Sequence, residues 1–206
     1  MPLSESTIQQ YDQTAGEYEK KWKRYLYHTH EKFLSKIETK PDDWILDLSG
    51  GTGLLAKKLV ERQFPFSRLV INDPSEGMLN IAKNRLPKDE RLSFTKFRAD
   101  RIPFEKNSFD RVFCLNAFHF YHNQQQTLDL LHLTLKTGGH LYLLDWNRSG
   151  LFRFMNTVIN LLTSAYIDTR SLPELEEMLK KSGFRVQQTD SWNWRYWKFL
   201  FVEAHK

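Results

Sequence analysis

A short apolar segment, followed at once by a glycine-rich turn and then a helix, restricts the fold of this chain more than any other feature. Residues 44–48 read WILDL, residues 49–53 read SGGTG, and apolar residues recur at helical spacing from Leu54 to Arg62. Glycines allow a sharp turn and a close approach of the backbone to a ligand, and the first turn of a helix has free N–H groups. The pattern predicts a strand–turn–helix unit with a ligand at the turn.

The alternation of strand and helix continues along the chain. Strands that alternate with helices form a mostly parallel sheet, and ligands bind at the carboxyl ends of its strands. We therefore expect an α/β fold with a doubly wound, Rossmann-like sheet of seven strands. Besides the first unit, strands are expected over residues 68–72, 92–98, 110–115, 140–144, 185–189 and 199–204, and helices over 76–85 and 127–136.

The charge and cysteine content argue against several classes of protein. The formal net charge is +5, but basic residues are spread along the chain, without the arm or stripe that binds nucleic acid. The single cysteine, Cys114, excludes an internal disulfide, and no segment has the ~18 uninterrupted apolar residues of a membrane span. The first residues lack the pattern of a secretion signal, and no linker divides the chain. We expect one cytoplasmic domain.

The glycine turn alone leaves two cofactor classes open. Gly51, Gly53 and Ala56 also satisfy the dinucleotide-binding pattern, and Asp73 would bind ribose hydroxyls in either case. A nicotinamide oxidoreductase is the alternative for the same fold. The chain has no Tyr-x-x-x-Lys pair of the short-chain type and no second domain for a substrate site, which argues against that alternative.

Several motifs together resemble one family, the class I S-adenosylmethionine-dependent methyltransferases, over nearly the whole chain. ILDLSGGTGLLAKKL is similar to their first motif, INDPSEGMLNIA to the second, FRADRIPFEKNSFDRVFC to the third, and LKTGGHLYLLD to the turn and fifth strand. The resemblance implies S-adenosylmethionine as cofactor and an antiparallel C-terminal edge of the sheet. It divides the single domain into an N-terminal helical lid (1–40), a cofactor-binding half (41–145) and acceptor-side helices with the last strands (146–206).

The resemblance also implies roles for individual residues. Asp47 and the loop after it correspond to the part that holds the methionine portion of the cofactor. Asp73 corresponds to the residue on the ribose hydroxyls and Met78 to the one against the adenine. Asp100 would face the adenine amino group, with a backbone contact from Arg101. The cofactor-binding residues implied in this way are Asp47, Ser49, Gly50, Gly51, Gly53, Asp73, Pro74, Met78, Asp100, Arg101 and Asn116.

Two positions depart from the family pattern. Thr137 stands where the family usually has Pro, which only loosens a turn preference. Ser49 stands where the family usually has Gly, and it adds a side chain in the loop nearest the cofactor. This difference keeps a catalytically degenerate cofactor-binding module as an alternative.

The segment after the fourth strand, residues 116–122 (NAFHFYH), should open on the methyl end of the cofactor. An acceptor hydroxyl, acidic carbon or thiol requires a base, and His119 is the candidate by position, although a histidine among aromatic residues is equally a packing residue. His122 is interpreted as a cap or surface residue and Cys114 as a core residue. Asn116 stands where a metal-dependent catechol site would need a carboxylate, so no metal is expected.

The N-terminal segment is similar to the entry segment of small-molecule family members. Tyr11, Tyr18 and Trp22 are expected to fold over the active site, with Tyr11 and Trp22 as substrate contacts and Tyr18 as a second catalytic candidate. A helix packed on the sheet through a simple amphipathic face explains the same spacing.

The segment after the fifth strand is expected to contact the acceptor. It begins with Trp146 and Arg148 and continues with an apolar stripe from Leu151 to Leu162. An apolar, aromatic lining predicts a small acceptor of the same character, although a core or a dimer face explains the stripe equally well. The chain is expected to be a monomer or a homodimer.

The preferred hypothesis is methyl transfer to a small apolar or aromatic acceptor at oxygen, carbon or nitrogen, as in the quinone-biosynthesis C-methyltransferases. An RNA or protein methyltransferase and the degenerate module are the alternatives. The chain lacks an Asn-Pro-Pro-Tyr type sequence, which argues against methylation of planar amino groups on adenine or glutamine, and it lacks the acidic pair of a protein-arginine enzyme.

Overall fold

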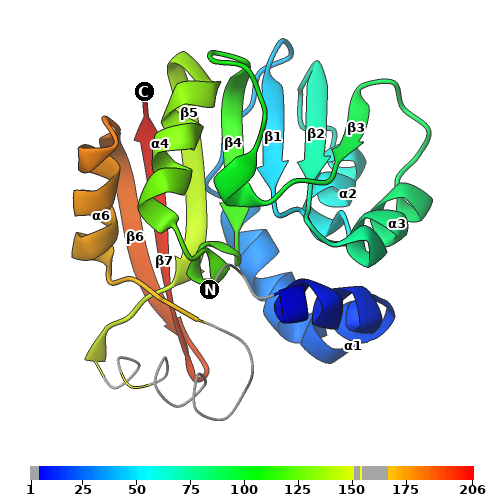
Figure 1. Ribbon diagram of the computed structural model, residues 1–206, viewed down its shortest axis with the longest axis horizontal. Helices are drawn as coiled ribbons and strands as arrows, with labels where there is room; N and C mark the ends of the chain where they lie inside the picture. Colours follow the sequence, from blue (N-terminus) through cyan, green and yellow to red (C-terminus); the bar gives the residue numbers. More distant parts are fainter. Residues whose placement is uncertain (1–4, 151–153, 155–166) are drawn as a thin grey trace.

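The computed structural model describes residues 5–150, 154 and 167–206 (Figure 1). The predicted apolar stripe from Leu151 to Leu162 therefore falls almost entirely outside the described residues. The helices and strands are, in chain order, α1 (Glu5–Leu34), β1 (Trp44–Leu48), α2 (Leu54–Glu61), β2 (Arg68–Asn72), α3 (Glu76–Arg85), β3 (Leu92–Thr95), η1 (Ala99–Arg101), β4 (Phe109–Leu115), η2 (Phe118–Phe120), α4 (Gln124–Thr134), β5 (Leu135–Trp146), α6 (Leu172–Lys181), β6 (Arg185–Trp194) and β7 (Trp197–His205).

The strands form one seven-stranded sheet in the order β3-β2-β1-β4-β5-β7-β6. Strands β1 to β5 pair in parallel, whereas β7 runs antiparallel to both β5 and β6. The predicted fold class and the antiparallel C-terminal edge are confirmed. The strand order reverses between β1 and β4, and in open α/β sheets ligands bind at such a switch point, beyond the carboxyl ends of the strands.

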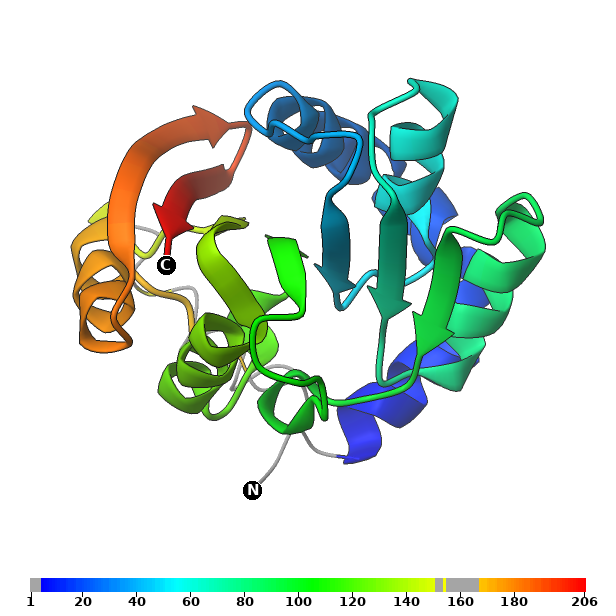
Figure 2. The same ribbon diagram turned by 90° about the horizontal axis from the view of Figure 1, so that it is seen from above.

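Helices cover both faces of the sheet, which explains why the central parallel strands are mostly apolar and buried (Figure 2). On one face, α1, α2 and α3 pack through Phe33, Leu59 and Leu79 against the sheet. On the other face, α4 and α6 pack through Leu131 and Leu179. The N-terminal segment is one continuous helix, and its first half lies across the carboxyl ends of the strands (Figure 1).

Several predicted boundaries were wrong. Helix α4 ends at Thr134 and β5 begins at Leu135, so Gly138 and Gly139 lie within a strand instead of ending a helix. The backbones of these two glycines exchange hydrogen bonds with the C-terminal Lys206, so distant pairing outweighs the local turn signal. The third strand is shorter than predicted, and the last two are longer because they pair as a hairpin.

Candidate functional site

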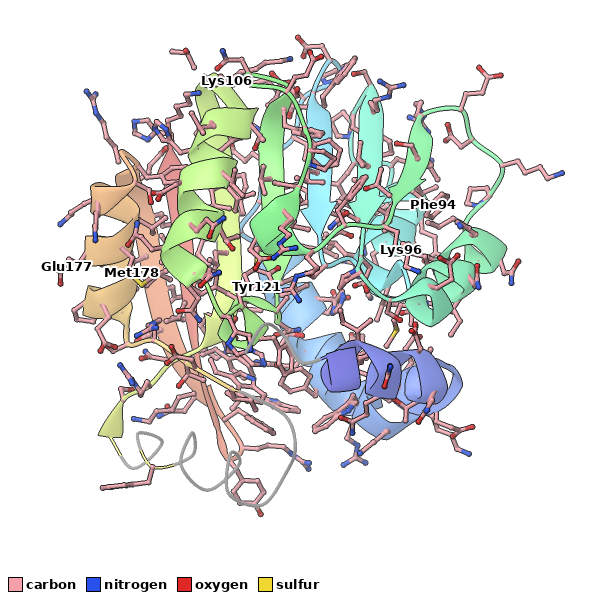
Figure 3. The ribbon with its side chains drawn as sticks, in the orientation of Figure 1. Phe94, Lys96, Lys106, Tyr121, Glu177 and Met178 are labelled. Carbon is pink, nitrogen blue, oxygen red and sulfur yellow. The ribbon has the colours of Figure 1, made fainter. Side chains whose placement is uncertain are left out.

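A cavity of about 100 Å³ lies where the carboxyl ends of β1, β2 and β4 meet the first half of α1. Next to it, a hollow of about 50 Å³ extends along the glycine loop. Tyr121, labelled in Figure 3, lies at this end of the sheet. The cavity is lined by Ile8, Tyr11, Tyr18, Ser49, Gly51, Asp73, Pro74, Ser75, Met78, Leu115, Asn116, Ala117, Phe120 and Tyr121, and the hollow is lined by Asp47 and Gly50 among others.

Most of the residues predicted to bind the cofactor are thus brought together, but several predicted site residues line neither space. Gly53 packs its backbone against α3, where an added Cβ would lie 2.9 Å from the Cβ of Ala82. Arg148 forms an ion pair with Glu174. The others that line neither space are Trp22, Asp100, Arg101, His119 and Trp146.

The glycine loop brings the backbone close to the end of β1. Gly51 and Gly53 have φ angles of 55° and 72°, which favour glycine. A Cβ at Gly50 would lie 2.7 Å from Oδ2 of Asp47, so a side chain there would collide with the carboxylate. Ser49 also has a positive φ, 58°, and its hydroxyl is 2.8 Å from the hydroxyl of Tyr121. The hydroxyl of the unusual Ser49 therefore has a hydrogen-bond partner, Tyr121, which also lines the cavity.

The Asp73 carboxylate is held in a fixed orientation at the end of β2. Its Oδ2 accepts a hydrogen bond from the backbone N–H of Gly51 at 2.9 Å, and its Oδ1 accepts one from the N–H of Ser75 at 2.9 Å. Burial raises the pKa of Asp73 to about 6. A carboxylate accepts several hydrogen bonds, so the remaining lone pairs can receive two neighbouring hydroxyl groups.

The Asp47 carboxylate is buried at the end of β1, and its Oδ2 has no hydrogen-bond partner. Burial, followed by the nearby charge of Asp73, raises the pKa of Asp47 to about 7. A buried acceptor without a partner is costly, which is a feature of sites completed by a ligand. A cationic or N–H donor group bound beside the glycine loop would satisfy this oxygen.

In the third predicted motif, two charged residues pair with one another. Asp100 lies in η1 and receives two hydrogen bonds from the guanidinium of Arg98, at 3.0 Å each. Arg101 is exposed. Arg98 was not among the expected site residues, although the opposite charges of Arg98 and Asp100, two residues apart, indicate that they can pair.

The first half of α1 is fastened over the site at two points. Oδ1 of Asp12 accepts hydrogen bonds from the Ser75 hydroxyl, at 2.5 Å, and from the backbone N–H of Gly77, at 2.8 Å. Further along the same helix, the Glu19 carboxylate accepts a hydrogen bond from the Thr52 hydroxyl at 2.5 Å and forms an ion pair with Arg85.

The first half of α1 covers the two spaces at the carboxyl ends of the strands. Ligand pockets usually enclose about 300–1,000 Å³. The two spaces under α1 enclose about 100 and 50 Å³, which is less than the usual volume of such a pocket. Tyr11, Tyr18 and Trp22 were expected to fold over the site. Asp12 and Glu19, whose side chains fix the first half of α1, were not expected there.

The variant Asp12→Ala should loosen the first half of α1, which Asp12 joins to Ser75 and Gly77. Loss of two hydrogen bonds to a carboxylate, worth at least about 1.4 kcal/mol, should speed amide hydrogen exchange in residues 8–18 by about tenfold. The same measurement on Glu17→Ala is the control, because Glu17 is exposed and, among the described residues, forms an ion pair with the equally exposed Lys20, at 3.8 Å. Equal exchange rates in the two variants would show that Asp12 does not hold the helix.

The second half of α1 is joined to the ends of β4 and β5 through a hydrogen-bonded chain. The Tyr25 hydroxyl donates to Oδ1 of Asn116 at 2.9 Å and accepts from the indole N–H of Trp146 at 2.8 Å. The Asn116 amide N–H donates to the Thr29 hydroxyl at 2.9 Å. Asn116 therefore lines the cavity while its side chain holds α1 in place. Trp22 packs edge-on against Tyr25, away from the cavity.

His119 is buried beside the cavity and bound by Asp145. Its Nδ1 is 2.5 Å from Oδ1 of Asp145, and its backbone N–H donates to Oδ2 at 2.9 Å. The ring stacks on Trp146, with centroids 4.2 Å apart, and its Nε2 is buried without a hydrogen-bond partner. Cys114 is fully buried, as predicted, and burial raises the pKa of its thiol.

Within residues 5–150, 154 and 167–206, no group of three or more His, Cys, Asp or Glu side chains is placed to hold a metal ion. Among the helices of these same residues, none has the length and apolar character needed to cross a membrane.

The comparisons with known proteins agree with this geometry. A family model described as a methyltransferase domain matches residues 46–143. A relative from Stenotrophomonas maltophilia, the ubiquinone/menaquinone biosynthesis C-methyltransferase UbiE, is 31% identical over 129 residues, covering 61% of this chain and 48% of the relative. The UbiE protein of Coxiella burnetii is 33% identical over 110 residues, covering 52% of this chain and 44% of the relative. The chain spans about half the length of these curated relatives.

Solved structures share the fold at low sequence identity. A chain from the complex between the Haloferax volcanii Trm112 methyltransferase activator and a methyltransferase has a TM-score of 0.82 and 21% identity, covering 95% of each chain. A phosphoethanolamine N-methyltransferase from Haemonchus contortus, solved with phosphomonomethylethanolamine and S-adenosylhomocysteine, has a TM-score of 0.75 and 19% identity, covering 87% of this chain and 52% of that one.

These findings decide between the two interpretations of the glycine turn. The matched family model, the relatives and the strand order all follow the methyltransferase pattern instead of the nicotinamide one. Residues 46–143 match the methyltransferase domain model, and the findings support a class I S-adenosylmethionine-dependent methyltransferase.

Proposed function

We propose that this chain binds S-adenosylmethionine at the carboxyl ends of β1 and β2 and transfers its methyl group to a small aromatic or apolar acceptor. The observation that carries the proposal is the Asp73 carboxylate, which two backbone N–H groups hold at the cavity wall. A carboxylate placed after the second strand, opposite a glycine loop after the first, suits the ribose of a nucleoside cofactor.

Each part of the site has a task in this function. The unpartnered Oδ2 of Asp47 suits the ammonium group of the methionine portion, and Met78 and Pro74 offer an apolar wall for the adenine. The bound cofactor would supply an electrophilic methyl group on a sulfonium. Since methyl transfer is an in-line displacement, the chain mainly has to align the two reactants and exclude water. The covering helix α1, with Tyr11 and Tyr18, is placed to exclude water.

The character of the cavity wall supports a small acceptor with an aromatic or apolar body. Tyr11, Tyr18, Phe120 and Tyr121 contribute four aromatic rings around a narrow space. The names of the relatives, which are C-methyltransferases of ubiquinone and menaquinone biosynthesis, agree with an aromatic acceptor. A macromolecular acceptor would need a wide open groove beside the methyl group of the cofactor. Helix α1 covers the cavity there instead.

Calorimetric titration of the purified chain tests the cofactor. S-adenosylmethionine and S-adenosylhomocysteine should bind with dissociation constants on the order of micromolar, and NAD should not bind. Binding of NAD alone would overturn the proposal. Labelled methyl transfer to fractions of a cell extract then tests the acceptor. Transfer only to RNA or protein would reject the small-molecule acceptor.

The variant Ser49→Gly tests whether the loop has degenerated. Glycine relieves the positive φ of Ser49 but removes its hydrogen bond to Tyr121, and these effects are each worth about 1 kcal/mol and oppose one another. The dissociation constant for S-adenosylhomocysteine, measured by calorimetry, should therefore change by less than about threefold. A much larger gain in affinity would favour a degenerate binding module.

A further inference from the structure

The hairpin of β6 and β7 has an aromatic tip that extends beyond the end of β5. The last residue of β5, Trp146, pairs with Phe199, so the turn at Arg195 and Tyr196 lies past the carboxyl ends of the parallel strands. The cavity lies at this same end of the sheet (Figure 1). Residues 191–202 include no acidic residue. Tyr196 is 91% exposed, so the tip presents an aromatic ring to solvent.

The neighbouring side of α1 is basic. Residues 20–27 read KKWKRYLY and include no acidic residue. Positions three and four apart lie on one face of a helix, so the helix gathers charges that the sequence intersperses with aromatic residues. The exposed side chains of this stretch are Lys20, Lys21, Lys23, Arg24 and Tyr27.

The hairpin tip and this side of α1 form one continuous surface. His28 of α1 stacks on Trp194, with ring centroids 4.6 Å apart, and Trp22 meets Trp197 edge-on at 6.4 Å. The Lys21 ammonium lies 5.6 Å from the centroid of the Trp22 ring. We refer to the exposed residues of both segments as the basic aromatic face; they are Lys20, Lys21, Lys23, Arg24, Tyr27, Arg195 and Tyr196.

The basic aromatic face carries an excess of positive charge. Acidic residues of α1 and β6 pair with basic residues as follows: Glu17 with Lys20, Glu19 with Arg85, Glu31 with Lys58, and Asp190 with Lys36. Within the part of the chain that the structure describes, no acidic side chain forms an ion pair with Lys21, Lys23 or Arg24. The complement of this face is therefore a negatively charged surface.

The packing of the aromatic rings favours a lipid surface over a nucleic acid. Single-stranded nucleic acids bind where aromatic faces are open for stacking with bases. Trp194 and Trp197 are instead half-buried against His28 and Trp22 of α1. At the tip, Tyr196 combines an apolar ring with a polar hydroxyl, and such residues lie at the level of lipid headgroups when basic side chains flank them.

We propose that the basic aromatic face binds the surface of a membrane that contains anionic lipids, with Tyr196 at the level of the headgroups. The lysine and arginine side chains meet the negative headgroups, and the contact is peripheral. Binding in this way turns the end of the sheet that holds the cavity toward the bilayer. The inference goes beyond the proposed function and does not depend on it, because binding to lipid requires neither cofactor nor acceptor.

Three variants test the charges and the ring separately. The double variant Lys23→Gln with Arg24→Gln removes two exposed charges from the basic aromatic face, and Tyr196→Ser removes the exposed ring. Lys180→Gln with Lys181→Gln is the matched control. It removes two exposed charges from the last turn of α6, at the opposite end of the sheet (Figure 1).

The experiment measures how much of the full chain sediments with vesicles of phosphatidylcholine alone, or of phosphatidylcholine and phosphatidylserine in equal parts. The wild type should bind the mixed vesicles but not the neutral ones, and added salt should weaken binding. A basic residue beside an anionic membrane contributes about fivefold, so the Lys23 and Arg24 double variant should bind about 25-fold more weakly at low salt. The control should bind as the wild type does. Tyr196→Ser should weaken binding at every salt concentration, because salt does not screen the contribution of the ring.

Thermal melts of the variants should match that of the wild type, since all the substituted side chains are exposed. The inference is overturned if the wild type does not bind the mixed vesicles, or if it binds the neutral vesicles equally well. An equal loss of binding in the Lys180 and Lys181 control would also overturn it, because the effect would then follow net charge alone. Salt-dependent binding to a uridine oligonucleotide without binding to vesicles would assign the face to nucleic acid and reject the membrane.

Discussion

Asp73→Ala is expected to weaken binding of S-adenosylmethionine by about 100-fold or more. A carboxylate that accepts two ribose hydroxyl groups contributes about 3 kcal/mol in total, and alanine leaves those hydroxyls without a protein partner. The same change also removes the carboxylate that accepts hydrogen bonds from the backbone N–H groups of Gly51 and Ser75. The glycine loop and the start of α3 are then no longer joined through this side chain. Calorimetry with S-adenosylhomocysteine at pH 8 measures the effect.

The wild type adds a pH test of the same residue. Because the pKa of Asp73 is raised to about 6, its carboxylate is ionised at pH 8 and becomes protonated as the pH falls through 6. Affinity should therefore be constant above about pH 7 and decline below about pH 6. Asp89→Ala is the control, since Asp89 pairs with Arg91 away from the site, at 2.6 Å. Unchanged affinity in Asp73→Ala would contradict the cofactor site described above.

Asp47→Asn is expected to stabilise the protein at pH 8 while weakening cofactor binding. The charged carboxylate is buried, its Oδ2 has no partner, and the charge of Asp73 is close by. Burial raises the pKa of Asp47 to about 7, far above its value of about 3.9 in an unfolded chain. Removing this charge should raise the free energy of unfolding by on the order of 2 kcal/mol, equivalent to roughly 4–8 °C in Tm.

The pH dependence follows from the direction of this shift. Between about pH 4 and 7 the folded chain holds a proton on Asp47 that the unfolded chain has lost, so the wild type loses stability as the pH rises through this window. The stabilisation by Asp47→Asn should be largest at pH 8 and vanish near pH 4 in thermal melts. Asp43→Asn is the matched control. It should lower the Tm, because Asp43 is also buried but its carboxylate forms an ion pair with Arg111 at 3.1 Å. A lower Tm for Asp47→Asn at pH 8 would contradict this account.

The sequence predicted that the glycine loop and Asp73 meet at one end of the sheet, and the structure confirms this placement because the signals are local. The glycine turn, the apolar strands beside it and the acidic residue after β2 lie within about one structural unit of the chain, and backbone geometry alone places them together. For the same reason, the order of strands and helices predicted the sheet correctly. Where a boundary depends on a distant partner, as at Gly138 and Gly139, the prediction was wrong because pairing with Lys206 extends β5.

The acceptor half was decided by contacts between segments far apart in the chain. Asp145 and His119 are 26 residues apart in the sequence, and Asp12 and Ser75 are 63 residues apart. No sequence pattern predicts that either pair forms a hydrogen bond. The sequence alone determined the fold, the position of the glycine loop and the acid at the end of β2. The tertiary structure decided which carboxylate pairs with His119 and where α1 is held over the strand ends, because both depend on hydrogen bonds that form only when the fold brings distant segments together.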